Sequence, residues 1–266
     1  MAQDDWITGN IKISVEGVPM EFNMTVTAAP VKPHRMLPIF QQMTNSMVAE
    51  GVKEVELEGK TISCKAHCGA CCRQGVPISE AEAYRIAEMV EAMPEPRNAQ
   101  IKERFEQAAA HFNKIGWYER FGEHLATAGQ RDRAEAEPEG IALAIEYFSQ
   151  GIPCPFLEDE SCSIHPDRPL TCREYLVTSP PENCGEPAPN KIDMVKLPLK
   201  PSRFFNRIVR TENLGTAPYL ILSQALEFVK ANPEKFPEKT GSDWVKDFFT
   251  ELSGKQIPEA VSEGKN

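Results

Sequence analysis

Residues 64–73 read CKAHCGACCR, with cysteine at four of the first nine positions. The two-residue gap between Cys68 and Cys71 lets both sulfurs turn toward one ion, and Gly69 permits the tight backbone that such a turn needs. Cys71 and Cys72 are adjacent, and the Cβ atoms of adjacent residues point in different directions in helix and strand alike. We therefore expect these two thiols to face different metal centres, or different atoms of one cluster.

The other four cysteines of the chain lie further along, at Cys154, Cys162, Cys172 and Cys184. Free cysteine is ordinarily a small buried hydrophobe scattered through a core, so confinement to two stretches indicates another role. The N-terminus has no basic and apolar leader, which predicts a cytoplasmic protein with reduced thiols. A disulfide scaffold is the alternative for a secreted chain. We interpret all eight as metal ligands: the first cysteine group is Cys64, Cys68, Cys71 and Cys72, and the second is Cys154, Cys162, Cys172 and Cys184.

Eight thiolates can be arranged around metal in more than one way. They can form two four-cysteine sites, or one four-cysteine iron–sulfur cluster such as 4Fe–4S with spare thiols. Structural zinc usually lies between two short knuckles, and the gaps of seven, nine and eleven residues in the second cysteine group are long for that pattern. The spacing favours an iron–sulfur cluster and leaves zinc as the alternative.

Basic residues stand beside the cysteines of an otherwise acidic chain. A thiolate-rich site stays negative after the metal is counted, so Arg73, Arg168 and Arg173 are expected to offset that charge from around the ligands. His67 and His165 could also ligate, since imidazole suits both zinc and iron. Because eight cysteines already suffice, we expect these histidines to lie around the ligands or to face solvent instead. The formal charge of −10 argues against nucleic acid as a partner. No apolar run approaches the roughly 18 residues of a membrane helix.

The hydrophobic pattern predicts an α+β fold that is mainly helical. Hairpins are expected at 10–27 and 55–62 and a strand at 191–199. A capping box at Ser79–Glu82 starts a helix that reaches Met93. Further helices are predicted over 37–50, 98–126, 138–149, 202–212, 219–231 and 242–252, with interruptions at Gly116 and Glu135–Pro138.

We expect residues 1–266 to form one compact domain. It would comprise an N-terminal hairpin and helix (1–60), a cysteine-cluster region (61–185), a C-terminal strand and helices (186–252) and a polar tail (253–266). The stretch 154–184 is dense in proline and short of periodicity. It predicts an irregular loop layer around the metal centre.

Three blocks occur in order: Cys68-Gly-Ala-Cys71-Cys72-Arg73, then Cys154-Pro-Phe-Leu, then Cys162-Ser-Ile-His165-Pro-Asp-Arg168-Pro with Cys172-Arg173. Over residues 61–175 this pattern resembles the zinc- or iron-chelating cysteine-cluster family, the YkgJ-like proteins of CxxCxxCC type, whose relatives include flagellin lysine N-methylases. The resemblance implies metal binding by seven of the cysteines. Cys184 lies outside the shared pattern, and the gap of three after Cys64 departs from it.

Three function classes follow. The first is an enzyme that uses the cluster, by family analogy a protein-lysine N-methylase. The second is an interaction module held by structural zinc, with a protein partner. The third is a metal carrier or redox protein. The Cys-x3-Cys-x2-Cys spacing also equals that of radical S-adenosylmethionine enzymes, but the helical pattern after Cys72 does not fit their barrel of repeated strands and helices.

Overall fold

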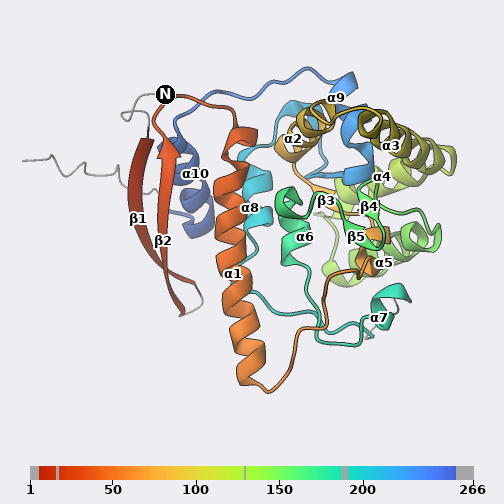
Figure 1. The fold of residues 1–266 in the computed structure, drawn as a ribbon, viewed down its shortest axis with the longest axis horizontal. Coiled ribbons are helices and arrows are strands. Elements are labelled where there is room, and N and C mark those ends of the chain that lie inside the picture. The colour runs from red at the N-terminus through yellow and green to blue at the C-terminus, as the bar shows by residue number, and fades with distance from the viewer. Residues whose placement is uncertain (1–5, 16–17, 129, 187, 189–190, 256–266) are drawn as a thin grey trace, which may run out of the picture.

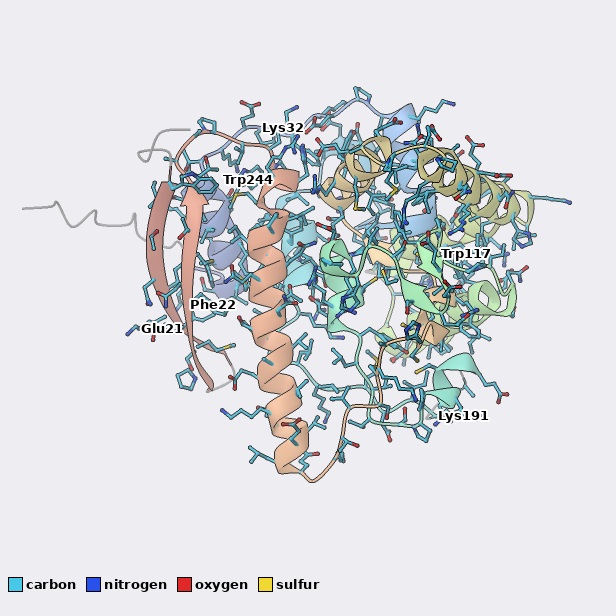
Figure 2. The ribbon with its side chains drawn as sticks, in the orientation of Figure 1. Glu21, Phe22, Lys32, Trp117, Lys191 and Trp244 are labelled. Carbon is cyan, nitrogen blue, oxygen red and sulfur yellow. The ribbon has the colours of Figure 1, made fainter. Side chains whose placement is uncertain are left out.

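An N-terminal β-hairpin forms one side of the molecule (Figure 1). The structure is a computed structural model that describes residues 6–15, 18–128, 130–186, 188 and 191–255. Strand β1 (Trp6–Val15) pairs antiparallel with β2 (Val18–Thr27). Side chains of β2 alternate between buried and exposed, and Figure 2 shows Phe22 on the side of the helices with Glu21 on the outer side. The first predicted hairpin is confirmed.

The buried face of the hairpin packs against a helical layer built on α1 (Leu37–Leu57). Helices α8 (Pro201–Ile208) and α10 (Gly241–Ser253) complete this layer. Its centre is Phe40, whose ring centroid lies 4.7 Å from that of Phe205 and 5.1 Å from that of Phe248. The layer buries apolar side chains from both ends of the sequence and makes the first of three cores.

The second predicted hairpin, at 55–62, is wrong. Helix α1 continues to Leu57, and the Glu58 N–H still donates to the Glu54 carbonyl. Gly59 follows with φ +76°, the left-handed conformation that ends helices. The Glu58-Gly59-Lys60 sequence is therefore a helix stop and not the turn of a hairpin.

Four helices and a shorter one form the other side of the molecule (Figure 1). They are α2 (Glu80–Glu91), α3 (Arg97–Lys114), α4 (Trp117–Ala128), α5 (Arg133–Ser149) and α9 (Ala225–Ala231). The Ser79 capping box is present at the start of α2, and Gly116 separates α3 from α4 with φ +67°. The interruption expected at Glu135–Pro138 is wrong, because the Asp132 side chain caps the Ala134 N–H and starts α5 ahead of the proline.

Short elements connect the two sides. Strand β3 (Pro77–Ile78) pairs with β6 (Leu220–Ile221), and β4 (Leu157–Glu158) pairs with β5 (Ser161–Cys162). Helices α6 (Leu170–Glu174) and α7 (Glu182–Gly185) are the only α-helices described between α5 and α8. This stretch is mostly irregular, and the fold is mainly helical with small antiparallel sheets, as predicted.

Two expectations for the C-terminal part need correction. The strand predicted over 191–199 is absent from its described residues, where Met194 makes only an isolated bridge to Val177. The helix predicted over 219–231 begins as β6 and becomes α-helical only at Ala225. The helices expected over 202–212 and 242–252 are confirmed as α8 and α10, and residues 256–266 of the predicted tail lie outside the described residues. No described helix is long and apolar enough to cross a bilayer.

Candidate metal centre

The two cysteine groups meet through their backbones. The Cys154 N–H donates to the Cys72 carbonyl at 2.7 Å. On the other flank, the Ser63 N–H donates to the Val177 carbonyl at 2.9 Å, and the Ser63 hydroxyl donates to the Thr178 carbonyl at 3.1 Å. These bonds bring together segments that α2 to α5 separate in sequence.

Gly69 allows the close approach of the two groups. A Cβ at this position would lie 2.6 Å from Glu160 Oε2 and 2.7 Å from Leu157 Cδ1, so the β4–β5 hairpin occupies the space of a side chain. Arg73 stabilises this contact with three hydrogen bonds. It donates to both carboxylate oxygens of Glu160, at 3.0 and 2.7 Å, and to the Gly69 carbonyl at 3.0 Å. A side chain at residue 69 would push the hairpin away.

Unfavourable backbone conformations concentrate at this contact. Among the described non-glycine residues, positive φ occurs at His67 (+60°), Asp159 (+47°) and Glu160 (+55°). Asp159 and Glu160 are the two central residues of the β4–β5 turn, and the His67 ring lies 3.2 Å from the Asp159 carbonyl and 3.1 Å from the Ser161 hydroxyl. Such conformations cost on the order of 1–3 kcal/mol each and cluster at functional sites.

All eight thiols are free. Cys184 is buried, Cys64 is exposed, and the other six are partly buried. Burial is the main cause that raises the pKa of most of these thiols, and the Cys71 thiolate adds to the rise at Cys64, Cys72, Cys154, Cys172 and Cys184. The same thiolate also acts on Cys162. The thiols of both groups therefore share one electrostatic environment.

Burial makes most of these thiols hard to ionise without a partner. It raises the pKa of Cys154 to about 12 and that of Cys172 well above the ordinary value. Cys71 differs, because a hydrogen bond from Cys72 lowers its pKa to about 7, and the same bond raises the pKa of Cys72. Crowded thiols that resist ionisation are suited to a cation, which binds the deprotonated form.

The three arginines predicted beside the site have different contacts. Arg73 is engaged by Glu160, and buried Arg173 donates to Asn45 and to the carbonyls of Pro166 and Arg168. Arg168 is the one whose charge lowers the pKa of several thiols, namely Cys64, Cys71 and Cys162. Its Nε is buried and has no hydrogen-bond partner among the described residues. That donor is available to an acceptor in the site.

Sequence analysis missed two residues that hold the thiols. Tyr175 accepts a hydrogen bond from Gln74 at 3.2 Å. Burial raises the pKa of Cys184, and a hydrogen bond with the Tyr175 hydroxyl opposes part of that rise. Glu82 was recognised only as part of the capping box. Its carboxylate also accepts from the Leu170 N–H at 2.8 Å, at the start of the helix that carries Cys172. Only the tyrosine's position next to Cys172-Arg173 could have drawn attention to it.

The donor types at this site fit a thiolate-bound metal. In the ranges that the structure describes, no three His, Cys, Asp or Glu side chains stand in a metal-binding arrangement. The chemistry of eight free thiols in two groups that meet, with the unpartnered Arg168 Nε, nevertheless fits an anionic metal–sulfur group.

The hollow between α4 and α5 lies elsewhere in the molecule. It is lined by Arg120, His124, Glu139 and Glu146 among others, and by no cysteine. Its charged groups are paired, with Arg120 2.6 Å from Glu146 and His124 3.1 Å from Glu139. It gives no pocket beside the thiols.

Residues 63–190 match the family model CxxCxxCC, described as "Putative zinc- or iron-chelating domain". The match confirms the resemblance seen in the sequence, and it extends past residue 175 to include Cys184 with the other seven cysteines. No curated protein and no solved structure matches the chain.

Proposed function

Residues 63–190 belong to the CxxCxxCC family, and from this premise we propose that the chain is an iron–sulfur protein whose eight cysteines are the metal ligands. The match supports metal binding by cysteines. The preference for iron–sulfur and the assignment of each ligand are our proposal. A bound cluster would supply one-electron transfer or a Lewis-acidic iron.

The meeting of the two cysteine groups, joined by the bond from the Cys154 N–H to the Cys72 carbonyl, carries the proposal. Thiols held close together repel one another as thiolates, and burial raises this cost for Cys154 and Cys172. A structure that keeps such thiols together gains stability when a cation replaces their protons. The β4–β5 turn, with positive φ at Asp159 and Glu160, has the conformation of a two-residue hairpin turn and places the hairpin that carries Cys162 against Gly69.

Two features support iron–sulfur over zinc. The second cysteine group spans irregular loops with wide spacing, which cluster ligation tolerates. The Arg168 Nε and the Tyr175 hydroxyl are donors beside the thiols, and hydrogen bonds to sulfur tune the potential of iron–sulfur clusters. Structural zinc in an interaction module is the second candidate. A protein-lysine N-methylase activity rests on the family resemblance alone.

Anaerobic purification with iron, zinc and acid-labile sulfide analysis tests the proposal, together with an ultraviolet–visible spectrum. We expect a coloured protein that contains iron and sulfide in comparable amounts. Colourless protein with stoichiometric zinc and no sulfide would overturn the iron–sulfur assignment. Ligation is tested separately with Cys71→Ser and Cys154→Ser, each of which should lower metal content, while Ser149→Ala at the exposed end of α5 should not.

A further inference from the structure

The outer edge of strand β1 is a row of backbone groups without a partner strand. Among the described residues only β2 pairs with β1, and β1 lies at the margin of the molecule with β2 between it and α1 (Figure 1). Pro19 has no N–H, so its pair with Ser14 is of the non-hydrogen-bonded kind, in which the backbone groups of both residues point away from the other strand. The two kinds of pair alternate along the ladder. The residues whose N–H and C=O groups point out of the hairpin are therefore Trp6, Thr8, Asn10, Lys12 and Ser14.

This edge lacks the features that usually keep exposed strands apart, which are prolines, several charges, bulges or a covering element. β1 is 10 residues long, contains no proline, pairs with β2 without a bulge and has Lys12 as its one charged residue. The free edge of β2 differs. It carries Pro19, and its end lies against α10, where a Cβ on Gly241 would be 2.8 Å from the Thr27 carbonyl oxygen. Of the two edges, that of β1 is the one suited to another strand.

The apolar face of β1 is incompletely covered. Side chains alternate along a strand, so Ile7, Ile11 and Ile13 share the face that is turned toward the helices. Their partners in β2 are all buried, whereas Ile7 is 44% exposed and the other two isoleucines are only half-buried. The hydrophobic side of the hairpin thus extends beyond the helical layer, and a further strand beside β1 would cover it.

Gly9 leaves space on the same face of β1. Glycine inside a strand weakens it and often marks a place where another chain approaches closely. Gly9 is not among the glycines with positive φ, and a Cβ on it would meet nothing within 4 Å. No contact among the described residues therefore requires a glycine at this position. A side chain from outside the hairpin would use the space.

A second copy of β1 supplies such a side chain. When two copies pair antiparallel about a two-fold axis at Asn10, the whole of Trp6–Ser14 is matched and the outward backbone groups of both copies meet. This register places Ile11 of each copy opposite Gly9 of the other. It is a non-hydrogen-bonded pair, the kind in which the two backbones lie closest and a glycine gives the most room. A shifted register would shorten the overlap and take Ile11 away from Gly9.

Charge also favours a second copy at this edge. The chain has a formal charge of −10, yet β1 contains no Asp or Glu, so two acidic chains can meet here with little repulsion. In the register centred on Asn10, each Lys12 lies opposite Thr8 of the other copy, and like charges do not face each other. We propose that the protein forms a two-fold symmetric dimer in which the β1 edges pair antiparallel, so that the two hairpins make one continuous sheet. This inference does not depend on the metal.

Analytical ultracentrifugation of the full chain under reducing conditions tests the dimer, which should have twice the chain mass of 29.7 kDa. Asn10→Pro removes the N–H at the two-fold axis and leaves the β1–β2 ladder intact, because that N–H points outward. The two hydrogen bonds lost per dimer should weaken association about 5- to 150-fold. Asn23→Pro is the matched control. It breaks the same Asn10–Asn23 side-chain bond of 2.7 Å but removes an N–H from the β2 edge, so it should leave association unchanged.

Charge at Thr8 tests the register without a change of backbone. Thr8→Asp places a carboxylate opposite Lys12 of the other copy twice per dimer and should tighten association roughly 2- to 30-fold. Thr8→Lys places like charges there and should weaken association by a similar factor. Both variants stay informative where a proline variant fails to fold.

Hydrogen exchange in the wild-type chain gives a third readout. The Asn10 and Lys12 amides should exchange more slowly as the chain concentration rises, while the Asn23 amide should not change. A wild-type chain that is monomeric at about 100 μM would overturn the proposal and leave the edge to a different partner protein. So would a dimer that Asn10→Pro and Asn23→Pro affect equally, or one in which the Asn10 amide exchanges as fast as in the monomer. Equal association of the two Thr8 variants would refute the register.

Discussion

Replacing Gly69 by alanine should weaken metal binding more than a comparable steric change elsewhere. The alanine backbone is not strained, since Gly69 has φ −92°. The new Cβ would lie 2.6 Å from Glu160 Oε2, 2.7 Å from Leu157 Cδ1 and 3.2 Å from Glu160 Cα. The first two atoms end side chains that can rotate. The Cα can move only with the β4–β5 turn, so the hairpin that carries Cys162 must shift.

The magnitude follows from these contacts. Overpacking of this kind costs about 1–3 kcal/mol. Displacing Glu160 from Arg73 adds little to this cost, because their side chains are 52% and 31% exposed and the ion pair is screened by solvent. The melting temperature should fall by roughly 2–4 °C per kcal/mol. The shift of the hairpin would change the position of Cys162 relative to Cys154. If the metal-bound state loses about 1–3 kcal/mol in this way, metal affinity falls roughly 5- to 150-fold.

Chelator competition measures the affinity, and thermal unfolding of the metal-free protein measures the stability. Gly241→Ala is the matched control, because its Cβ would lie 2.6 Å from Val26 Cβ and 2.8 Å from the Thr27 carbonyl oxygen. It should destabilise the hairpin layer and leave metal affinity unchanged in the folded protein. Wild-type affinity in Gly69→Ala, or an equal loss in both variants, would refute the reasoning.

Three further results are expected. Burial raises the pKa of Glu174 to about 7, so the folded chain keeps a proton there that the unfolded chain releases nearer 4.5. The wild-type free energy of unfolding should therefore fall as pH rises from about 5 to 7, and urea titrations of Glu174→Gln should lack this component. Arg168→Met should raise the pKa of Cys64, Cys71 and Cys162, so that acid releases metal at a higher pH; an unchanged midpoint would contradict the role of Arg168. Metal removal should speed hydrogen exchange in residues 154–184 while sparing the β1–β2 hairpin, and equal protection before and after chelation would count against metal support of the loop.

Local signals predicted much of the fold. Alternation in β2 and the Ser79 capping box act within a few residues, and both are present. The strand predicted over 191–199 failed because its apolar residues pack on α1. A Cβ at Gly51 of that helix would lie 2.7 Å from Leu197 Cδ2 and 3.3 Å from Val195 Cγ1. An extended segment against a helix has the same sequence pattern as a strand.

Part of the candidate site could likewise be predicted from the sequence, and part of it could not. Eight cysteines and Arg168 could be named from the sequence because residue type and proximity in the chain mark them. Glu160 could not, since its contact with Arg73 depends on a turn that brings together residues far apart in sequence. Nor could Tyr175, because its hydroxyl reaches the Cys184 sulfur only when the loop between them is folded.

The hydrogen bond from Cys154 to the Cys72 carbonyl has a consequence for biosynthesis. It closes a loop that contains all of α2 to α5. At about 5–20 residues per second, the ribosome takes several seconds to reach Cys154 after it has made Cys72. During that interval the first four thiols are already made and their partners do not exist. With the ligand set proposed above, metal loading would wait until the second cysteine group has emerged, and the first thiols would be exposed to oxidation or to another metal in the meantime.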